Sequence, residues 1–199
     1  MLERFLRVAR RPMIFYLRAP MARLCAAAGL RTAGIGQDRR LDVEALLDRP
    51  PKEVLGALRH ADKVAFSIEE ARLGAHRDRL DAISTAYLAR AEITKEVTFL
   101  NRPMRHEDDG LRRLFLLKQG EAIFGFAVLN PVFRGGRVEG WLLDLLRLER
   151  TRQWGVWLST VHALAGRLRA EGAGLAVGFA PLHGVEHPPG ASRALAWQL

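Results

Sequence analysis

The stretch from Leu111 to Arg147, LRRLFLLKQGEAIFGFAVLNPVFRGGRVEGWLLDLLR, decides the fold. It holds three apolar runs, which are separated by turn signals at Gln119-Gly120 and Gly135-Gly136. Apolar runs bounded by glycine turns are typical of β-strands, and connections this short join antiparallel neighbours. The sequence therefore predicts an antiparallel meander of three strands in the middle of the chain.

Helices and strands alternate on both sides of this meander. Upstream, a helix begins with Pro50, and VAFSIEEA at 64–71 predicts a strand that leads into a helix over His76–Ile93. Downstream, Gln153–Ala170 predicts a helix, and GLAVGFAPL at 174–182 predicts a buried strand before a last helix. This order predicts an α+β (mixed α/β) fold, with a mostly antiparallel central sheet flanked by helices.

The residues before Pro50 predict a smaller, separate piece. The basic N-terminus MLERFLRVARRP has the apolar spacing of an amphipathic helix. A strand at 13–18, a helix at 20–29 and a strand at 30–36 follow, and GQDRR at 36–40 predicts a closing turn. We therefore expect two domains, a basic helix with a β-α-β piece at 1–48 and the main domain at 50–199.

Composition describes an ordinary globular protein with a strong positive charge. The formal net charge is +9 and the isoelectric point is about 10.8. A polyanionic partner, either nucleic acid or an anionic membrane surface, would explain the excess, and so would an arginine-biased genome. Cys25 is the only cysteine, which excludes an internal disulfide, and no apolar run is long enough to span a membrane. A cytoplasmic protein is expected.

The stretch APLHGVEHPPG at 180–190 contains a zinc-protease pattern, H-x-x-E-H, formed by His183, Glu186 and His187. That chemistry needs a continuous helix, and here Gly184 lies inside the pattern and two prolines follow it. Proline disfavours helical backbone at the preceding residue. The sequence therefore predicts a loop and no metal site.

Three stretches carry a resemblance to a known family: FGFAVLNPVFRGG at 124–136, GWLLDLLR at 140–147 and GFAPLHG at 178–184. They look like the C-terminal catalytic domain of phosphatidylglycerol lysyltransferases, the aminoacyl-phosphatidylglycerol synthases of bacteria. That family carries an Asp-Leu-Met-Arg-like strand end and a Gly-(Met/Leu)-Ala-Pro-Leu-Ser-Gly strand exit. LRTAGIGQDRRLDV, LGALRHADK and DAISTAYL resemble earlier landmarks in the same order, so the resemblance covers roughly residues 25–190.

The resemblance implies a GNAT-like acyltransferase fold and a function. The family is built from two GNAT-like halves, so residues 1–48 would be the remnant of the first and residues 50–199 the second, without its last strands. Such enzymes transfer an amino acid, lysine or a similar one, from aminoacyl-tRNA to the headgroup of an anionic phospholipid such as phosphatidylglycerol. The implied location is cytoplasmic, peripheral to the inner face of the membrane, and a partner chain or a further segment would complete the fold.

The resemblance also implies site residues. Asp144 and Arg147 stand at the strand end, where the acid would face the attacking amine or hydroxyl and the arginine a phosphate. Substrate-binding positions carried over are Arg152, Gly155, Phe179, Pro181 and His183, the last standing where the family has serine. Residues three apart on a regular strand point to opposite faces, so a shared site for Asp144 and Arg147 predicts irregular backbone near Leu145–Leu146.

The turn from Arg152 to Trp157 bears on the donor. A CoA-dependent GNAT enzyme needs an Arg/Gln-x-x-Gly-x-Gly/Ala turn, whose backbone N–H groups contact the pyrophosphate. Arg152 and Gly155 fit this pattern, but Trp157 replaces its last small residue. We therefore expect no cofactor and aminoacyl-tRNA as the donor. The alternatives are a CoA-dependent N-acyltransferase on a small amine and a catalytically inactive relative that binds lipid or RNA.

Overall fold

The computed structural model describes residues 19–32, 36–90, 96, 103–107, 110–149 and 155–181, with residues 38 and 179–181 limited to the backbone. The chain divides into two compact units, one formed by residues 38–179 and the other by residues 1–37 with 180–199. Helix α2 (Ala19–Ala27) belongs to the second of these units and forms where the sequence predicts a helix at 20–29. It carries the buried Cys25. The predicted domain boundary near residue 49 stays a prediction.

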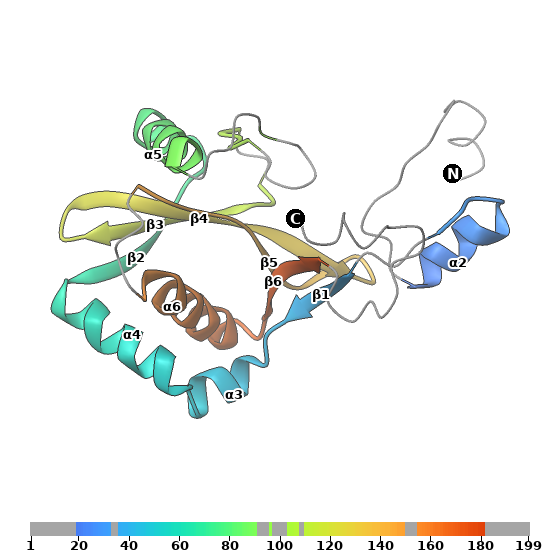
Figure 1. Cartoon of the computed structure of the whole chain (residues 1–199), viewed down its shortest axis with the longest axis horizontal. Helices are drawn as coiled ribbons and strands as arrows, with labels where there is room; N and C mark the ends of the chain where they lie inside the picture. Colours follow the sequence, from blue (N-terminus) through green and yellow to red (C-terminus); the bar gives the residue numbers. More distant parts are fainter. Residues whose placement is uncertain are drawn as a thin grey trace, which may run out of the picture. The chain divides into compact units, whose positions relative to one another are not determined.

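A six-stranded sheet organises the protein, in the spatial order β1-β6-β5-β4-β3-β2 (Figure 1). The strands are β1 (Gly36–Arg40), β2 (Phe66–Ala71), β3 (Arg113–Gln119), β4 (Ala122–Arg134), β5 (Arg137–Leu148) and β6 (Gly174–Pro181). The neighbours from β2 to β5 pair antiparallel, and β6 pairs parallel with β5. The predicted meander and the mixed α+β class are therefore confirmed.

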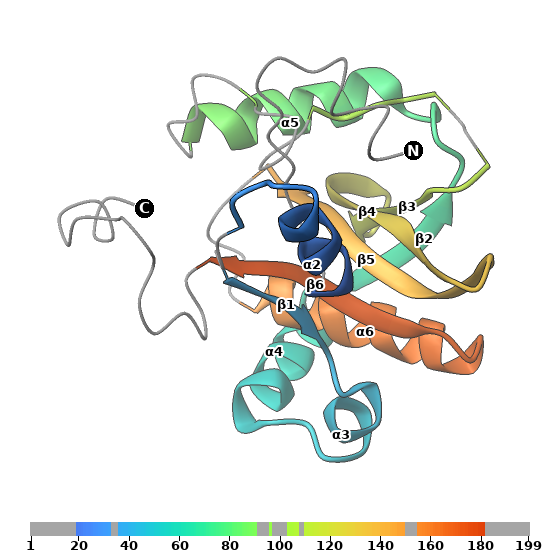
Figure 2. The same ribbon diagram turned by 90° about the vertical axis from the view of Figure 1, so that its right-hand side faces the viewer.

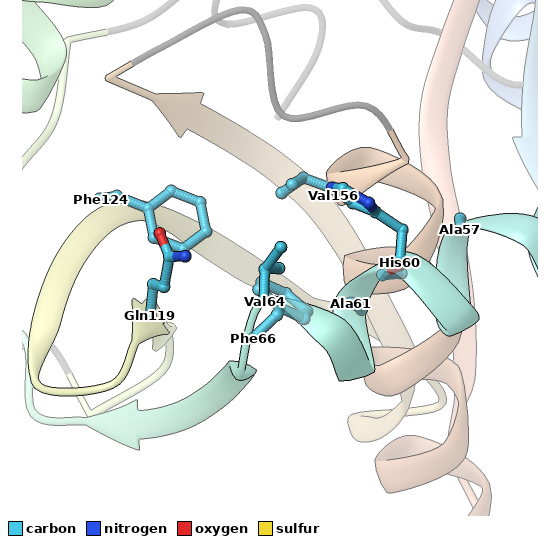
Figure 3. A pocket seen from close by; sticks show the side chains of 9 residues that line it. Ala57, His60, Ala61, Val64, Phe66, Gln119, Phe124 and Val156 are labelled. Carbon is cyan, nitrogen blue, oxygen red and sulfur yellow. The ribbon is translucent and has the colours of Figure 1, made fainter.

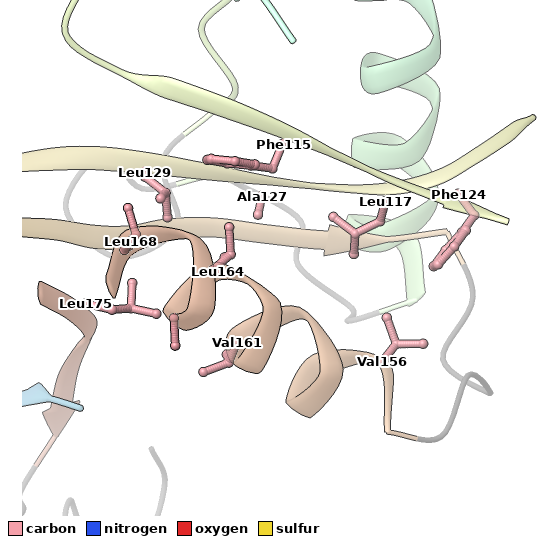
Figure 4. Packing of buried hydrophobic residues seen from close by; sticks show 11 residues of the cluster. Phe115, Leu117, Phe124, Ala127, Leu129, Val156, Val161, Leu164, Leu168 and Leu175 are labelled. Atoms are coloured by element: carbon pink, nitrogen blue, oxygen red, sulfur yellow. The ribbon is translucent and has the colours of Figure 1, made fainter. Parts of the chain in front are cut away.

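Helices cover both faces of this sheet (Figures 1 and 2). Helix α6 (Val156–Ala170) packs on one face together with α3 (Val43–Asp48) and α4 (Lys52–Lys63), and α5 (Arg77–Arg90) packs on the other. The larger apolar core lies under α6, where Leu164 and Leu168 meet Phe115 and Leu129 of the sheet (Figure 4). A second core joins Leu80 and other residues of α5 to the opposite face. Both faces of the central strands are buried in this way.

Two local predictions before residue 50 are wrong. GQDRR forms strand β1 instead of a turn, and the chain at residues 30–32 is not a strand. The strand forms because β6 offers an edge: the N–H of Leu41 donates to the carbonyl of Leu175 at 2.9 Å. Helix α3 was not predicted, although Asp42 caps it by accepting from the N–H of Ala45 at 3.0 Å. The predicted strand at 13–18 and the last predicted helix lie outside the described residues.

Candidate active site

Asp144 lies at a β-bulge in β5. The ladder joins Val128 of β4 to Leu145 and Leu129 to Leu143, so the register steps over Asp144. Leu143 and Leu146 therefore both pack into the core under α6, although regular alternation would place residues three apart on opposite faces. The irregularity that the sequence predicted at Leu145–Leu146 is present one residue earlier.

The ladder continues beyond this bulge through Arg147, which lies opposite Phe126 of β4. Because the step in register lies at Asp144 itself, alternation no longer forces the side chains of Asp144 and Arg147 to opposite faces. Asp144 is half-buried and Arg147 is fully buried. The backbone thus meets the requirement for a shared site, and the roles of the two residues stay predictions.

Arg147 is a buried cation, with 2% of the residue exposed. Its Nη2 donates to Oε1 of Glu96, and its guanidinium carbon lies 5.9 Å from the centre of the Tyr87 ring of α5. A buried guanidinium needs a counter-charge, because its removal from water is costly. A phosphate that bound Arg147 would therefore have to replace or join the Glu96 carboxylate, which is 22% exposed.

Helix α5 holds the end of β5 through two further arginines. Arg79 donates to the two carboxylate oxygens of Glu149 at 3.2 and 2.6 Å, and its Nε donates to the carbonyl of Ile123 at 2.8 Å. Arg90 donates to the carbonyl of Glu149 at 2.8 Å, and its guanidinium carbon lies 5.5 Å from the centre of the Tyr87 ring. Tyr87 is thus flanked by two guanidinium groups, an arrangement that favours the cations electrostatically.

The sequence reasoning did not find this cationic face. It gave no role to Tyr87 or Glu96. The available signal was the spacing of Arg79, Ile83, Tyr87 and Arg90, which places all four on one side of a helix. That side faces the sheet, because Ile83 is fully buried in the core under α5.

Gly155 begins α6 and serves the packing of two helices. Its φ of 78° lies in the left-handed region, and a Cβ added there would stand 2.7 Å from the Cβ of Ala57 in α4. Both the left-handed backbone and the close approach of Ala57 therefore require glycine at this position. Arg152 and His183 lie outside the described residues. Phe179 and Pro181 lie at the end of β6, and only their backbone is described.

Two hollows lie away from Asp144 and Arg147. The first, between α4, α6 and the sheet, is about 10 Å³ and is lined by His60, Phe66 and Ser159, among others (Figure 3). It has room for about one water molecule, and the buried hydroxyl of Ser159 has no hydrogen-bond partner among the described residues. The second, about 180 Å³, opens at the start of β5 and β6 beside Arg40 and Trp141. Neither is lined by a predicted site residue that the structure describes.

Within the described ranges, no group of three or more His, Cys, Asp or Glu side chains could hold a metal ion. No helix there is long and apolar enough to cross a membrane. The H-x-x-E-H pattern at 183–187 lies outside these ranges.

The sequence profile of the family "phosphatidylglycerol lysyltransferase, C-terminal" matches residues 1–198. The chain belongs to this family. The match agrees with the resemblance drawn from the strand-end and strand-exit stretches, and it supports a transferase. A search of curated proteins found no match.

Solved structures share the fold of this chain. L-PGS from Bacillus licheniformis is 20% identical with a TM-score of 0.69, over 90% of this chain and 55% of that one. The C-terminal domain of a protein assigned as a lysylphosphatidylglycerol synthetase from Agrobacterium fabrum is 20% identical with a TM-score of 0.62, over 82% and 52%. A Bacteroides thetaiotaomicron protein of unknown function is 12% identical, with a TM-score of 0.55 over 80% and 57%. The chain thus spans about half the length of these structures.

Proposed function

We propose that this domain transfers an amino acid, lysine or a similar one, from aminoacyl-tRNA to the headgroup of an anionic phospholipid such as phosphatidylglycerol. The observation that carries the proposal is the family match over residues 1–198. The two solved lysylphosphatidylglycerol synthetase structures with the same fold support it. The donor, the acceptor and the location at the inner face of the membrane are parts of the proposal.

The transfer exchanges one ester for another. A headgroup hydroxyl attacks the carbonyl carbon of the aminoacyl ester, a new ester bond forms, and the bond to the tRNA ribose oxygen breaks. The proton of the attacking hydroxyl must leave, and the ribose oxygen must receive one. We assign the first task to Asp144, since a half-buried carboxylate can act as a general base toward a hydroxyl within hydrogen-bond reach.

We assign to Arg147 the binding of the negatively charged phosphate of the acceptor lipid. Its guanidinium is already held by Glu96 and Tyr87 and is therefore fixed in direction. A lipid phosphate that displaced Glu96 would exchange one anionic partner for another and would leave no buried charge unbalanced. The net charge of +9 suits both proposed partners, because tRNA and the anionic leaflet each attract a basic protein.

The test is lipid mass spectrometry on cells that express the chain, beside an Asp144→Asn variant and an Asp62→Asn control on α4. A new aminoacylated lipid in the parent and the control, but not in Asp144→Asn, would support the proposal and name both substrates. Equal product from Asp144→Asn would remove Asp144 from the chemistry. If the parent makes no such lipid but binds acetyl-CoA saturably, the CoA-dependent alternative is favoured.

A further inference from the structure

The tip of the β4–β5 hairpin carries two apolar side chains and two arginines, all of them exposed. Phe133 lies opposite Val138 in the ladder, and Arg134 lies opposite Arg137. Phe133 is 51% exposed, Val138 46%, and the side chain of Arg134 75%. Since neighbouring residues of a strand point to opposite faces, the tip has one apolar face and one cationic face.

This tip is a tight turn that extends beyond the neighbouring strands. Gly135 and Gly136 have φ values of 55° and 78°, and two left-handed residues are what a tight type I′ turn requires. Strand β3 last pairs with β4 at Leu129, and β6 first pairs with β5 at Gly140. Residues 133–138 therefore extend past both neighbouring strands (Figure 2).

Two features of the tip are energetically unfavourable in water: repulsion between like charges and exposed apolar surface. Like charges directly opposite each other in a ladder repel, as Arg134 and Arg137 do here. Glu139 lies 3.2 Å from Arg134, whereas Arg137 has no ion pair among the described residues. Single exposed apolar residues are ordinary, but here two lie opposite each other at the end of the hairpin. A partner with an anionic surface layer and an apolar interior would offset both the repulsion between the arginines and the exposure of the apolar pair.

We infer that this hairpin tip docks the protein on the surface of an anionic phospholipid bilayer. Phe133 and Val138 enter the boundary between headgroups and acyl chains, and Arg134 and Arg137 contact headgroup phosphates. The choice of lipid rests on the proposed function, and the docking surface goes beyond it.

RNA fits this tip less well. Arginines bind RNA phosphates, and Phe133 could stack on a base, but the aliphatic Val138 has no ring to stack. A bilayer uses all four side chains, since it takes the apolar pair and the arginines at once.

The experiment is co-sedimentation of the full chain with vesicles of phosphatidylcholine alone or mixed with phosphatidylglycerol, without any donor. Three double variants are compared: Phe133→Ala/Val138→Ala, Arg134→Ala/Arg137→Ala, and Leu55→Ala/Arg59→Ala on α4. The last is the matched control, because Leu55 is 42% exposed and Arg59 is exposed too. Circular dichroism establishes that each variant is folded.

We expect the parent and the α4 control to bind the mixed vesicles alike. The apolar double variant should lose about tenfold in affinity. Docking would bury the exposed half of Phe133 and Val138 in the bilayer, and the alanine variants lose most of this apolar contact. The arginine double variant should lose about 25-fold in affinity for mixed vesicles and little for phosphatidylcholine, since each of the two arginines adds about fivefold near an anionic surface.

Several results would overturn the inference. One is a parent that does not bind the mixed vesicles, and another is hairpin variants that bind them as the parent does. A third is arginine variants that lose tRNA binding but keep vesicle binding, which would make the tip an RNA surface. A fourth is a dimer of the parent that Phe133→Ala dissociates, which would make it a contact between copies. Because no donor is present, vesicle binding can fail while aminoacyl transfer stands, and the reverse.

Discussion

Gly155 begins α6 at a point where the helix almost touches α4, and replacing it by alanine should destabilise the protein strongly. The added Cβ would lie 2.7 Å from the Cβ and 2.9 Å from the Cα of Ala57. Forcing a residue with a side chain into the left-handed region costs about 1–2 kcal/mol. Overpacking a tight contact costs about 1–3 kcal/mol more. The expected loss for Gly155→Ala is therefore about 2–5 kcal/mol in the free energy of unfolding.

Two other glycines of the same helix region separate the two causes. Gly172 also has a left-handed φ, 70°, but no atom lies within 4 Å of its added Cβ, so Gly172→Ala should cost only about 1–2 kcal/mol. Gly166 lies inside α6, where the nearest atom to its added Cβ is Cδ2 of Leu47 at 3.8 Å. Gly166→Ala should stabilise the protein by about 0.5–1 kcal/mol.

Urea unfolding of the parent and the three variants measures these differences. In a chain of this size 1 kcal/mol shifts the midpoint of thermal unfolding by about 2–4 °C, so melting curves should rank the variants in the same order. If Gly155→Ala were no less stable than Gly172→Ala, the close contact of α4 with α6 would be refuted. Glycine at 155 would then be better explained by the approach of a phosphate-bearing donor, as the GNAT-type turn pattern suggests.

Two further predictions concern ion pairs. Glu96→Gln leaves the buried guanidinium of Arg147 without its counter-charge and should lower the free energy of unfolding by about 3 kcal/mol. If Arg147 is a phosphate ligand, glycerol phosphate should raise the melting temperature of this variant more than that of the parent. Hydrogen bonds from Arg113 at 2.7 and 2.9 Å lower the pKa of Glu70 in the folded protein. Ionised Glu70 therefore contributes its full stabilisation of the fold above the unfolded pKa of about 4.3, and this contribution is lost as the pH falls through the lower folded pKa. Glu70→Gln should therefore flatten the decline of the unfolding free energy at acid pH.

The central elements could be predicted because each has a local cause. Glycine turns separate the strands of the meander, and proline and glycine bound the helices, so β2 to β6 and α4 to α6 appear where the sequence places them. GQDRR shows the limit of such reasoning. Its composition is that of a turn, and it becomes a strand because it lies beside β6, a segment far away in the chain. The hydrogen bond from Leu41 to Leu175 directly follows this strand. Strand formation at an edge depends on the partner, which local composition does not contain.

The surroundings of Arg147 were harder to predict for a related reason. Glu96 and Tyr87 lie far from Arg147 in the sequence, and neither stands in a recognisable motif. What the sequence does contain is the constraint that a buried arginine must find an anion. Without the fold, any of the acidic residues could meet that need, so the constraint predicts that a partner exists and not which residue it is.

The bulge at Asp144 shows how a chemical argument can reach further than a pattern. In β5 the residues Leu142, Leu143, Leu145 and Leu146 are all leucine, and both faces of the strand contact apolar cores. An apolar residue therefore suits every position in either register, and hydrophobic periodicity cannot reveal a step between them. The requirement that an acid and an arginine three residues apart share one site does imply such a step. A step one residue before the expected position agrees with the same uniformity, since Leu143, Leu145 and Leu146 still pack against one or the other core.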